Sequence, residues 1–201
     1  RRFAALQQAV EADVAGRRES VREEISFVDN LEWLLAGPQE LLEDEGFPNR
    51  ITHNDTKCNN VLLDNATNRA LCVIDLDTVM PGLALYDLGD LVRTTATARP
   101  EDEPDLSLVV AREELVEQAI RGFLAGTSGA LAPREVESLA FGPPYMALIM
   151  ATRFLTDYLA GDTYYRIHHE HHNLQRARAQ LALTRSLLGR KDFLRALCTP
   201  G

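Results

Sequence analysis

Residues 51–77 read ITHNDTKCNNVLLDNATNRALCVIDLD, and the interpretation of the whole chain starts from this stretch. Two short apolar runs, 61–63 and 71–74, flank the turn-forming residues 64–68. Apolar runs of strand length separated by such a turn are typical of a β-hairpin. Polar residues stand before the first run and after the second. We therefore expect the hairpin to bring these polar side chains together.

The polar side chains suit the transfer of a phosphoryl group to a hydroxyl. That reaction needs a carboxylate that orients the hydroxyl, a cation for the phosphate charge, and Mg²⁺. Asp55 fits the first role and Lys57 the second. Asn60 and Asp75 offer oxygen ligands of the kind that Mg²⁺ prefers. Asp77 is either a further metal or substrate contact or an exposed Asp at the end of a strand.

The spacing sharpens this prediction. The order His53-x-Asp55-x-Lys57-x-x-Asn60 follows the catalytic loop of protein kinases, in which Lys stands two and Asn five residues after the Asp. A strand then leads to Asp75, where that fold places its second metal-binding Asp. We expect His53 to have a structural role, because its imidazole can hold the loop through hydrogen bonds. The motif at 53–60 and the strand that leads to Asp75 together predict a kinase-type site.

Composition excludes several other classes of protein. The 201 residues are 45% hydrophobic and 25% charged, with a net charge of −9 and no basic stripe, so we expect no nucleic-acid partner. No apolar run reaches the ~18 residues of a membrane helix, so we expect no membrane association. The three cysteines are sparse and odd in number. They favour a reducing, cytoplasmic location and buried thiols.

The remainder of the chain has apolar residues at helical spacing. We expect two helices within 2–36, the second of which ends at Gly37-Pro38. Further expected elements are helices at 86–93, 113–125, 133–159 (perturbed near Pro143) and 173–188, a loop at 78–84, and a mobile acidic loop at 99–105. No alternating βαβ pattern is present. The predicted fold class is mainly α with a small β-hairpin (α+β).

Three motifs, HNDTKCNNVLLD, VIDLDTVMPG and YDLGDLVRT, resemble the aminoglycoside phosphotransferase and choline kinase superfamily, which has a kinase-like fold. Weaker similarity extends the resemblance over most of residues 50–185. Within the superfamily the motifs are most similar to those of N-acetylhexosamine 1-kinases. Those enzymes phosphorylate the anomeric hydroxyl of N-acetylglucosamine and N-acetylgalactosamine with ATP and Mg²⁺. The resemblance therefore implies an ATP- and Mg²⁺-dependent sugar kinase of carbohydrate metabolism.

The resemblance also implies a domain organisation. In this superfamily an N-terminal β-rich lobe grips ATP, whereas the residues before 50 here have a helical pattern and no glycine-rich strands. We expect residues 1–201 to form a single C-terminal helical lobe of a kinase-like phosphotransferase. Its parts would be a helical lead-in at 1–48, the catalytic loop and metal-binding hairpin at 50–77, and a helical substrate-binding part at 78–201. The ATP-binding lobe would be absent from this chain, and the isolated lobe would then be inactive.

Three more residues receive roles. Asp87 lies in an apolar helical segment, and the matching Asp of the family accepts hydrogen bonds from the backbone of the catalytic loop. Arg153 lies in an otherwise apolar run, where its fork of donors suits the hydroxyl and acetamide oxygens of a sugar. Its alternative role is an ion pair with Asp157, four residues on. Arg93 is a second candidate for binding the substrate.

Other functions stay open. The same chemistry can act on choline or an aminoglycoside, and the acidic residues 101–105 would then face a cationic substrate. A non-catalytic kinase-like binding domain is an alternative from another class. The cluster His168–His172 admits a zinc site or metallohydrolase, but it lacks the His-Glu-x-x-His order and a third ligand. We favour histidines that are solvated or that stand at the start of a helix.

Overall fold

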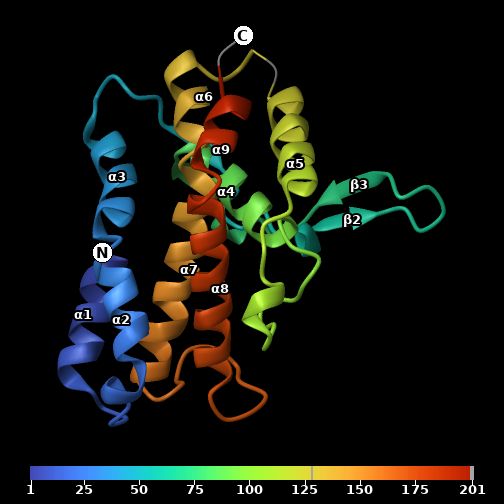
Figure 1. The fold of residues 1–201 in the computed structure, drawn as a ribbon. Coiled ribbons are helices and arrows are strands. Elements are labelled where there is room, and N and C mark those ends of the chain that lie inside the picture. The colour runs from blue at the N-terminus through green and yellow to red at the C-terminus, as the bar shows by residue number, and fades with distance from the viewer. Residues whose placement is uncertain (128, 200–201) are drawn as a thin grey trace.

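A computed structural model describes residues 1–127 and 129–199 and is mainly helical (Figure 1). The helices are α1 (Arg2–Ala12), α2 (Arg22–Asp29), α3 (Glu32–Glu43), α4 (Ala84–Thr95), α5 (Glu113–Gly126), α6 (Pro133–Leu139), α7 (Gly142–Leu159), α8 (His172–Leu188) and α9 (Lys191–Leu197). The strands are β1 (Arg50–Thr52), β2 (Val61–Leu63), β3 (Ala70–Val73) and β4 (Met80–Gly82). The predicted α+β class with few strands is confirmed.

The long helices α7 and α8 lie side by side at the centre of the helical body (Figure 1). Helix α4 packs across α7 and carries a buried apolar face. Leu85, Leu88 and Val92 on that face are fully buried, and their spacing of three and four residues is that of one helix side. On α7, Leu148 and Leu155 are equally buried. Because α4 is packed against α7 in this way, the residues in its first turn are held in place.

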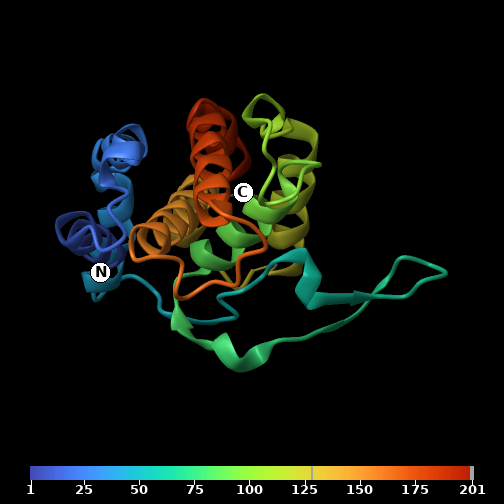
Figure 2. The ribbon, with the colours of Figure 1, turned by 90° about the horizontal axis from the view of Figure 1, so that it is seen from below.

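The predicted hairpin is confirmed. Strand β2 pairs antiparallel with β3, with Val61 opposite Val73. The turn between them forms because Asp64 Oδ1 accepts hydrogen bonds from the backbone N–H groups of Ala66 (3.1 Å) and Thr67 (2.8 Å). The hairpin extends away from the helical body (Figure 2).

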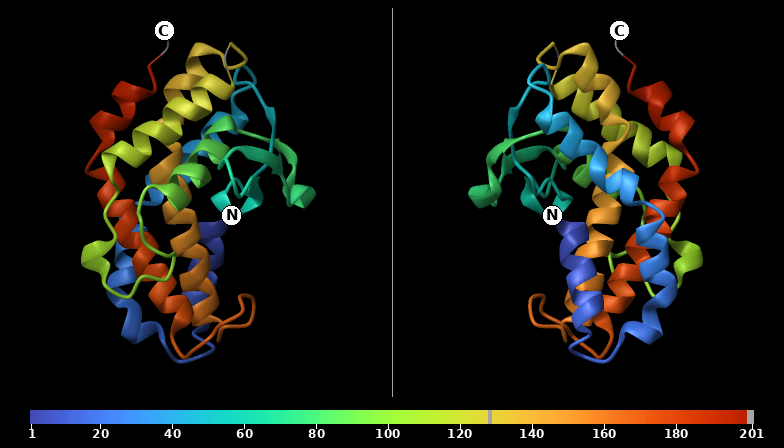
Figure 3. Two further views of the ribbon diagram at one scale, coloured as in Figure 1. Left: turned by 90° about the vertical axis from the view of Figure 1, so that its right-hand side faces the viewer. Right: turned by 90° about the vertical axis from the view of Figure 1, so that its left-hand side faces the viewer.

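A second antiparallel pair was not anticipated, because each of its strands has only three residues. Strand β1 pairs with β4, which falls in the segment expected to be a loop at 78–84, and Arg50 lies opposite Gly82. Next to this pair, Thr78 Oγ1 donates to the carbonyl oxygen of His53 at 2.7 Å. The pair therefore closes the segment 53–79 at its base, on one side of the helical body (Figure 3).

The predicted end of a helix at Gly37-Pro38 is wrong, because α3 continues through both residues to Glu43. Packing overrides the sequence signal here. Pro38 is buried, and a Cβ on Gly37 would lie 2.7 Å from the Cζ atom of Phe141. The helix runs on because this surface of α3 lies against α7.

The acidic loop at 99–105 is not a free, solvated segment either. Glu103 is buried, Glu101 pairs with Arg93 at 2.6 Å, and Asp102 lies 2.9 Å from His172. The expectation of buried thiols holds only for Cys198, since Cys58 and Cys72 are exposed. None of the helices in the described part of the chain is long and apolar enough to cross a membrane.

Candidate active site

The loop that follows β1 is held by the first turn of α4. Asp87 accepts the backbone N–H groups of His53 (2.9 Å, Oδ2) and Asn54 (2.7 Å, Oδ1). Thr56 Oγ1 donates to the carbonyl oxygen of Asp87 at 2.5 Å. Burial raises the pKa of the Asp87 carboxyl, although the two N–H donors oppose that change. Each oxygen of this carboxylate therefore fixes one residue of the loop.

Asp55, Lys57 and Asn60 meet on this loop. Lys57 Nζ lies 2.6 Å from Asp55 Oδ2, and Asn60 Nδ2 donates to the same oxygen and to the Asp55 carbonyl, both at 2.8 Å. Burial acts to raise the pKa of Asp55, but the hydrogen bonds from Lys57 and Asn60 outweigh it and leave this pKa below its usual value. The bond with Asp55 raises the pKa of Lys57. At neutral pH both groups are charged.

Asp75 joins this group from the other end of the hairpin. The Asn60 carbonyl accepts the N–H of Ile74 at 2.9 Å, which places the next residue, Asp75, with its Oδ2 3.8 Å from Lys57 Nζ. Asp75 has the left-handed backbone conformation, with φ 65° and ψ 55°. Such strain in a residue other than glycine concentrates at functional sites. On the same side, His53 Nε2 lies 3.1 Å from the Ile74 carbonyl oxygen.

The oxygen donors here fit the requirements of Mg²⁺. Asn60 Oδ1 accepts no hydrogen bond from the described residues, and the Asp75 carboxylate is about half exposed. Mg²⁺ is usually held by one or two carboxylates, with water and substrate phosphates completing its shell. The described residues contain no group of three or more His, Cys, Asp and Glu that would hold a metal by themselves. Asp77 is exposed, and among the described residues it makes no hydrogen bond to Asp55, Lys57, Asn60 or Asp75.

Residues 1–126 match the family model described as the phosphotransferase enzyme family, which is more than half of the 201-residue chain. The chain belongs to this family. The matched part contains the complete loop, the hairpin and α4. The predicted family and the broader prediction of a phosphotransferase are thus confirmed.

The Arg93 side chain forms ion pairs with two carboxylates. Its Nε lies 2.9 Å from Asp90 Oδ1 and its Nη1 2.6 Å from Glu101 Oε1, and only 5% of its side chain is exposed. Burial acts to lower the pKa of Arg93, but the two carboxylates raise it. Arg93 and Lys57 line the same cavity, of about 380 Å³. The partner Asp90, three residues before Arg93, was detectable from sequence spacing, whereas Glu101 was not.

Arg153 lines a different cavity, of about 240 Å³, together with Tyr164 and Tyr165. Its guanidinium carbon lies 5.5 Å from the centre of the Tyr165 ring. The alternative ion pair with Asp157 is wrong, because that carboxylate instead accepts the backbone N–H groups of residues 163–165 at 2.8–2.9 Å. Among the described residues, no hydrogen bond or ion pair joins Arg153 to the loop that follows β1.

The histidine cluster lies at the start of α8, as expected. His172 is its first residue, but it is buried rather than solvated. Its Nε2 lies 2.9 Å from Asp102 Oδ2, and its Nδ1 accepts the backbone N–H of His168 at 3.2 Å. Asp102 is 70 residues away in sequence, so no local pattern indicated this contact.

Proposed function

We propose that this chain carries the catalytic half of an ATP-dependent kinase that phosphorylates the anomeric hydroxyl of an N-acetylhexosamine or a related sugar. The observation that carries the proposal is the Asp55 carboxylate held between Lys57 and Asn60, beside Asp75. Membership of the phosphotransferase family supports the reaction type. The choice of sugar rests on the resemblance of the motifs in residues 53–94 to hexosamine 1-kinases.

Asp55 is the residue that would orient the acceptor hydroxyl. Its Oδ2 is occupied by Lys57 and Asn60, whereas Oδ1 accepts no hydrogen bond from the described residues and is available to the hydroxyl. The lowered pKa makes this carboxylate a weak base. It would therefore position the hydroxyl first and take the proton late, as the loose transition state of phosphoryl transfer allows.

The side chains of Asn60, Asp75 and Lys57 would act on the phosphoryl donor. Asn60 Oδ1 and the Asp75 carboxylate would hold Mg²⁺, which neutralises phosphate charge when it is bound with ATP. Lys57 lies between Asp55 (2.6 Å) and Asp75 (3.8 Å), a position from which its ammonium would face the transferred phosphoryl group. Asp77, being exposed, would serve only as a secondary contact. In the superfamily that the motifs resemble, an N-terminal lobe supplies the remaining nucleotide contacts, and that lobe is predicted to be absent from residues 1–201.

Arg153 is a better candidate than Arg93 for binding the sugar. Arg93 already uses its donors on Asp90 and Glu101, whereas Arg153 has no carboxylate within 4.0 Å among the described residues. The aromatic rings beside Arg153 suit the apolar face of a sugar. The acidic loop offers little to a cationic substrate such as choline, because Glu101 and Asp102 are engaged by Arg93 and His172.

The test is a phosphorylation assay with ATP and Mg²⁺, on a protein that includes any segment its gene encodes before Arg1. The acceptors are N-acetylglucosamine, N-acetylgalactosamine, choline and an aminoglycoside, and ³¹P NMR identifies the product. We expect a sugar 1-phosphate. Turnover of choline or the aminoglycoside alone would contradict the proposal that the acceptor is a sugar. ATP binding without turnover of any acceptor would favour a non-catalytic binding domain.

Asp55→Asn tests the role of the carboxylate. General-base catalysis contributes ~10²–10⁴-fold, so we expect kcat to fall at least ~100-fold. Asp29→Asn is the matched control, because Asp29 is exposed and its side chain is bonded, among the described residues, only to Gln7 at 2.8 Å. Near-normal turnover by Asp55→Asn would remove Asp55 from the mechanism.

A further inference from the structure

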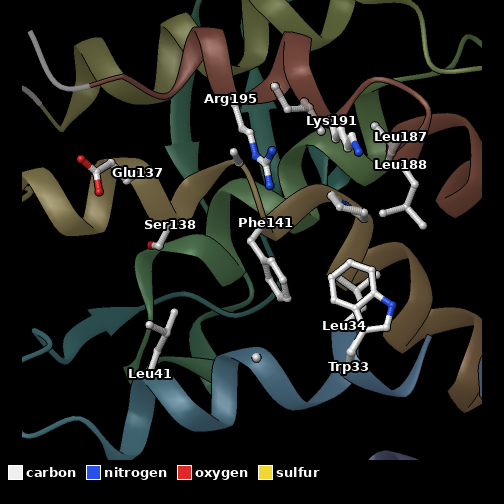
Figure 4. A pocket seen from close by; sticks show the side chains of 14 residues that line it. Trp33, Leu34, Leu41, Glu137, Ser138, Phe141, Leu187, Leu188, Lys191 and Arg195 are labelled. Atoms are coloured by element: carbon white, nitrogen blue, oxygen red, sulfur yellow. The ribbon is translucent and has the colours of Figure 1, made fainter. Parts of the chain in front are cut away.

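A cavity of about 380 Å³ lies between α3, the junction of α6 and α7, and the junction of α8 and α9 (Figure 4). None of the proposed site residues lines it. We propose that it binds an amphiphilic carboxylate of the medium-chain fatty-acid type, with the alkyl chain on the apolar floor and the carboxylate at a cationic edge. This proposal is independent of the phosphotransfer site.

The floor of the cavity is apolar and firmly built. Leu34, Leu187 and Leu194 are at most 1% exposed and belong to the two buried cores. Phe141 comes close to α3 because Gly37 has no side chain, and a Cβ there would meet the ring at 2.7 Å. Cavities of 300–1,000 Å³ with apolar walls and a few polar groups are typical sites for small molecules.

One wall of the cavity is an exposed tryptophan. Trp33 is 57% exposed, and its ring meets Phe141 edge to face, with the ring centroids 6.2 Å apart. In Figure 4 the two rings stand side by side with Leu34 near them. A large aromatic side chain left open to water above an apolar floor gains free energy from burial, because apolar surface is then removed from water. A ligand on this floor would provide that burial.

The edge formed by α9 is positively charged. Lys191 has no carboxylate within 4.0 Å in the described part of the chain, and Arg195 has only Asp192, at 3.8 Å and with both side chains largely exposed. Such an exposed pair contributes little. Figure 4 shows Arg195 reaching toward Phe141, whereas the carboxylate of Glu137 points away from it. In a chain of net charge −9, this cationic edge above an apolar floor is complementary to a carboxylate.

Trp33 makes the proposal measurable, because it is the only tryptophan of the sequence. The experiment titrates the full chain with sodium decanoate, below its micelle concentration, and follows tryptophan fluorescence. We expect a saturable change. Octanoate should bind more weakly, by roughly fourfold for each methylene lost, because each buried methylene contributes ~0.8 kcal/mol.

Charge reversal tests the cationic edge. The double variant Lys191→Glu/Arg195→Glu should weaken decanoate binding by about tenfold. Arg18→Glu is the matched control, since Arg18 is exposed, outside the cavity, and without an ion pair in the described chain. Circular dichroism checks that the variants fold. Asp55→Asn should bind decanoate normally, which separates this proposal from the proposed kinase activity.

Three results would overturn the proposal. The first is the lack of a saturable fluorescence change. The second is equal affinity for decanoate and decanol, or for the charge-reversed variant and the native chain, because the cationic edge would then have no role. The third is a dimer in analytical ultracentrifugation that is lost with Trp33→Glu, which would make this face a contact between two copies of the chain.

Discussion

Asp87 links the helical body to the loop that follows β1 through a single carboxylate. Its two oxygens each accept one backbone N–H, from His53 and Asn54, and the next residue along the loop is Asp55. Asn54 has a positive φ of 62°, a conformation that Asn tolerates better than most residues. The position of Asp55 therefore depends on a carboxylate that is bonded to the backbone of the two residues before it.

Asp87→Asn should damage both stability and turnover. An amide has one acceptor oxygen, so one backbone N–H loses its partner and faces an NH₂ group instead. The cost of an unsatisfied buried donor is about 1–3 kcal/mol, which urea denaturation would measure. We expect kcat to fall by about 10- to 100-fold, within the range for loss of catalytic positioning. Unchanged stability and unchanged kcat together would show that α4 does not hold the loop.

The sequence predicts that residues lie close together when they belong to one loop or to paired strands. Asp55, Lys57 and Asn60 lie within one loop, and the hairpin register carries Asp75 back beside them. The contact between His172 and Asp102 could not be found in this way. It depends on how a loop folds against α8, and no periodicity encodes that.

At the scale of elements, the crossing of α4 and α7 sets where Asp87 stands. The two helices meet at Gly89 and Gly142, where a Cβ on Gly89 would lie 2.5 Å from the Gly142 carbonyl oxygen. A glycine inside a helix costs about 1 kcal/mol relative to alanine. The close approach of the two backbones explains why α4 has glycine at this position.

Gly89→Ala and Gly122→Ala should therefore have opposite effects on stability. At Gly89 the new methyl group meets backbone that cannot move aside, and overpacking of this kind costs about 1–3 kcal/mol. At Gly122, on α5, no atom of the described residues lies within 4 Å of the added Cβ, apart from its chain neighbours and the backbone of its own helix. That variant should gain up to about 1 kcal/mol from helix propensity. Urea denaturation of both variants measures the difference, and stabilisation by Gly89→Ala would contradict the close helix crossing.

Helix boundaries show where sequence patterns reach their limit. The apolar spacing of α4 was sufficient to predict it, because its buried face is continuous from Leu85 to Val92. In α3 the local signal of Gly37-Pro38 indicated an end, but contact with Phe141 outweighs that preference. Tertiary packing decides such cases, and a single sequence does not display it.

At the scale of the whole molecule, an ion pair ties strand β1 and the segment that follows it to the helical body. Arg50, on β1, binds Glu135 of α6 with Nε–Oε1 at 2.8 Å and Nη2–Oε2 at 2.5 Å. The Glu135 side chain is only 1% exposed. The hydrogen bond from Arg50 lowers the pKa of Glu135 below its ordinary value of 4.5, although burial opposes this. The pair thus anchors the strand that leads into residues 51–77.

This pair should make stability depend on pH in the acid range. Because the folded state lowers the pKa of Glu135, its contribution is complete above about pH 4.5 and is lost as the pH falls through the lower, folded pKa. Glu135→Gln should destabilise the chain at pH 7 by about 1–3 kcal/mol, since a charged hydrogen-bonded partner of Arg50 is lost.

The difference between Glu135→Gln and the native chain should then shrink as the pH falls from 5 to 3, in thermal unfolding followed by circular dichroism at low salt. Comparing the two chains removes the opposite effect of Asp87, whose pKa is raised by burial. Glu11→Gln is the control, because Glu11 is exposed and has no ion pair in the described chain. A Glu135→Gln difference that stays constant over this pH range would show that Glu135 is not held ionised by Arg50.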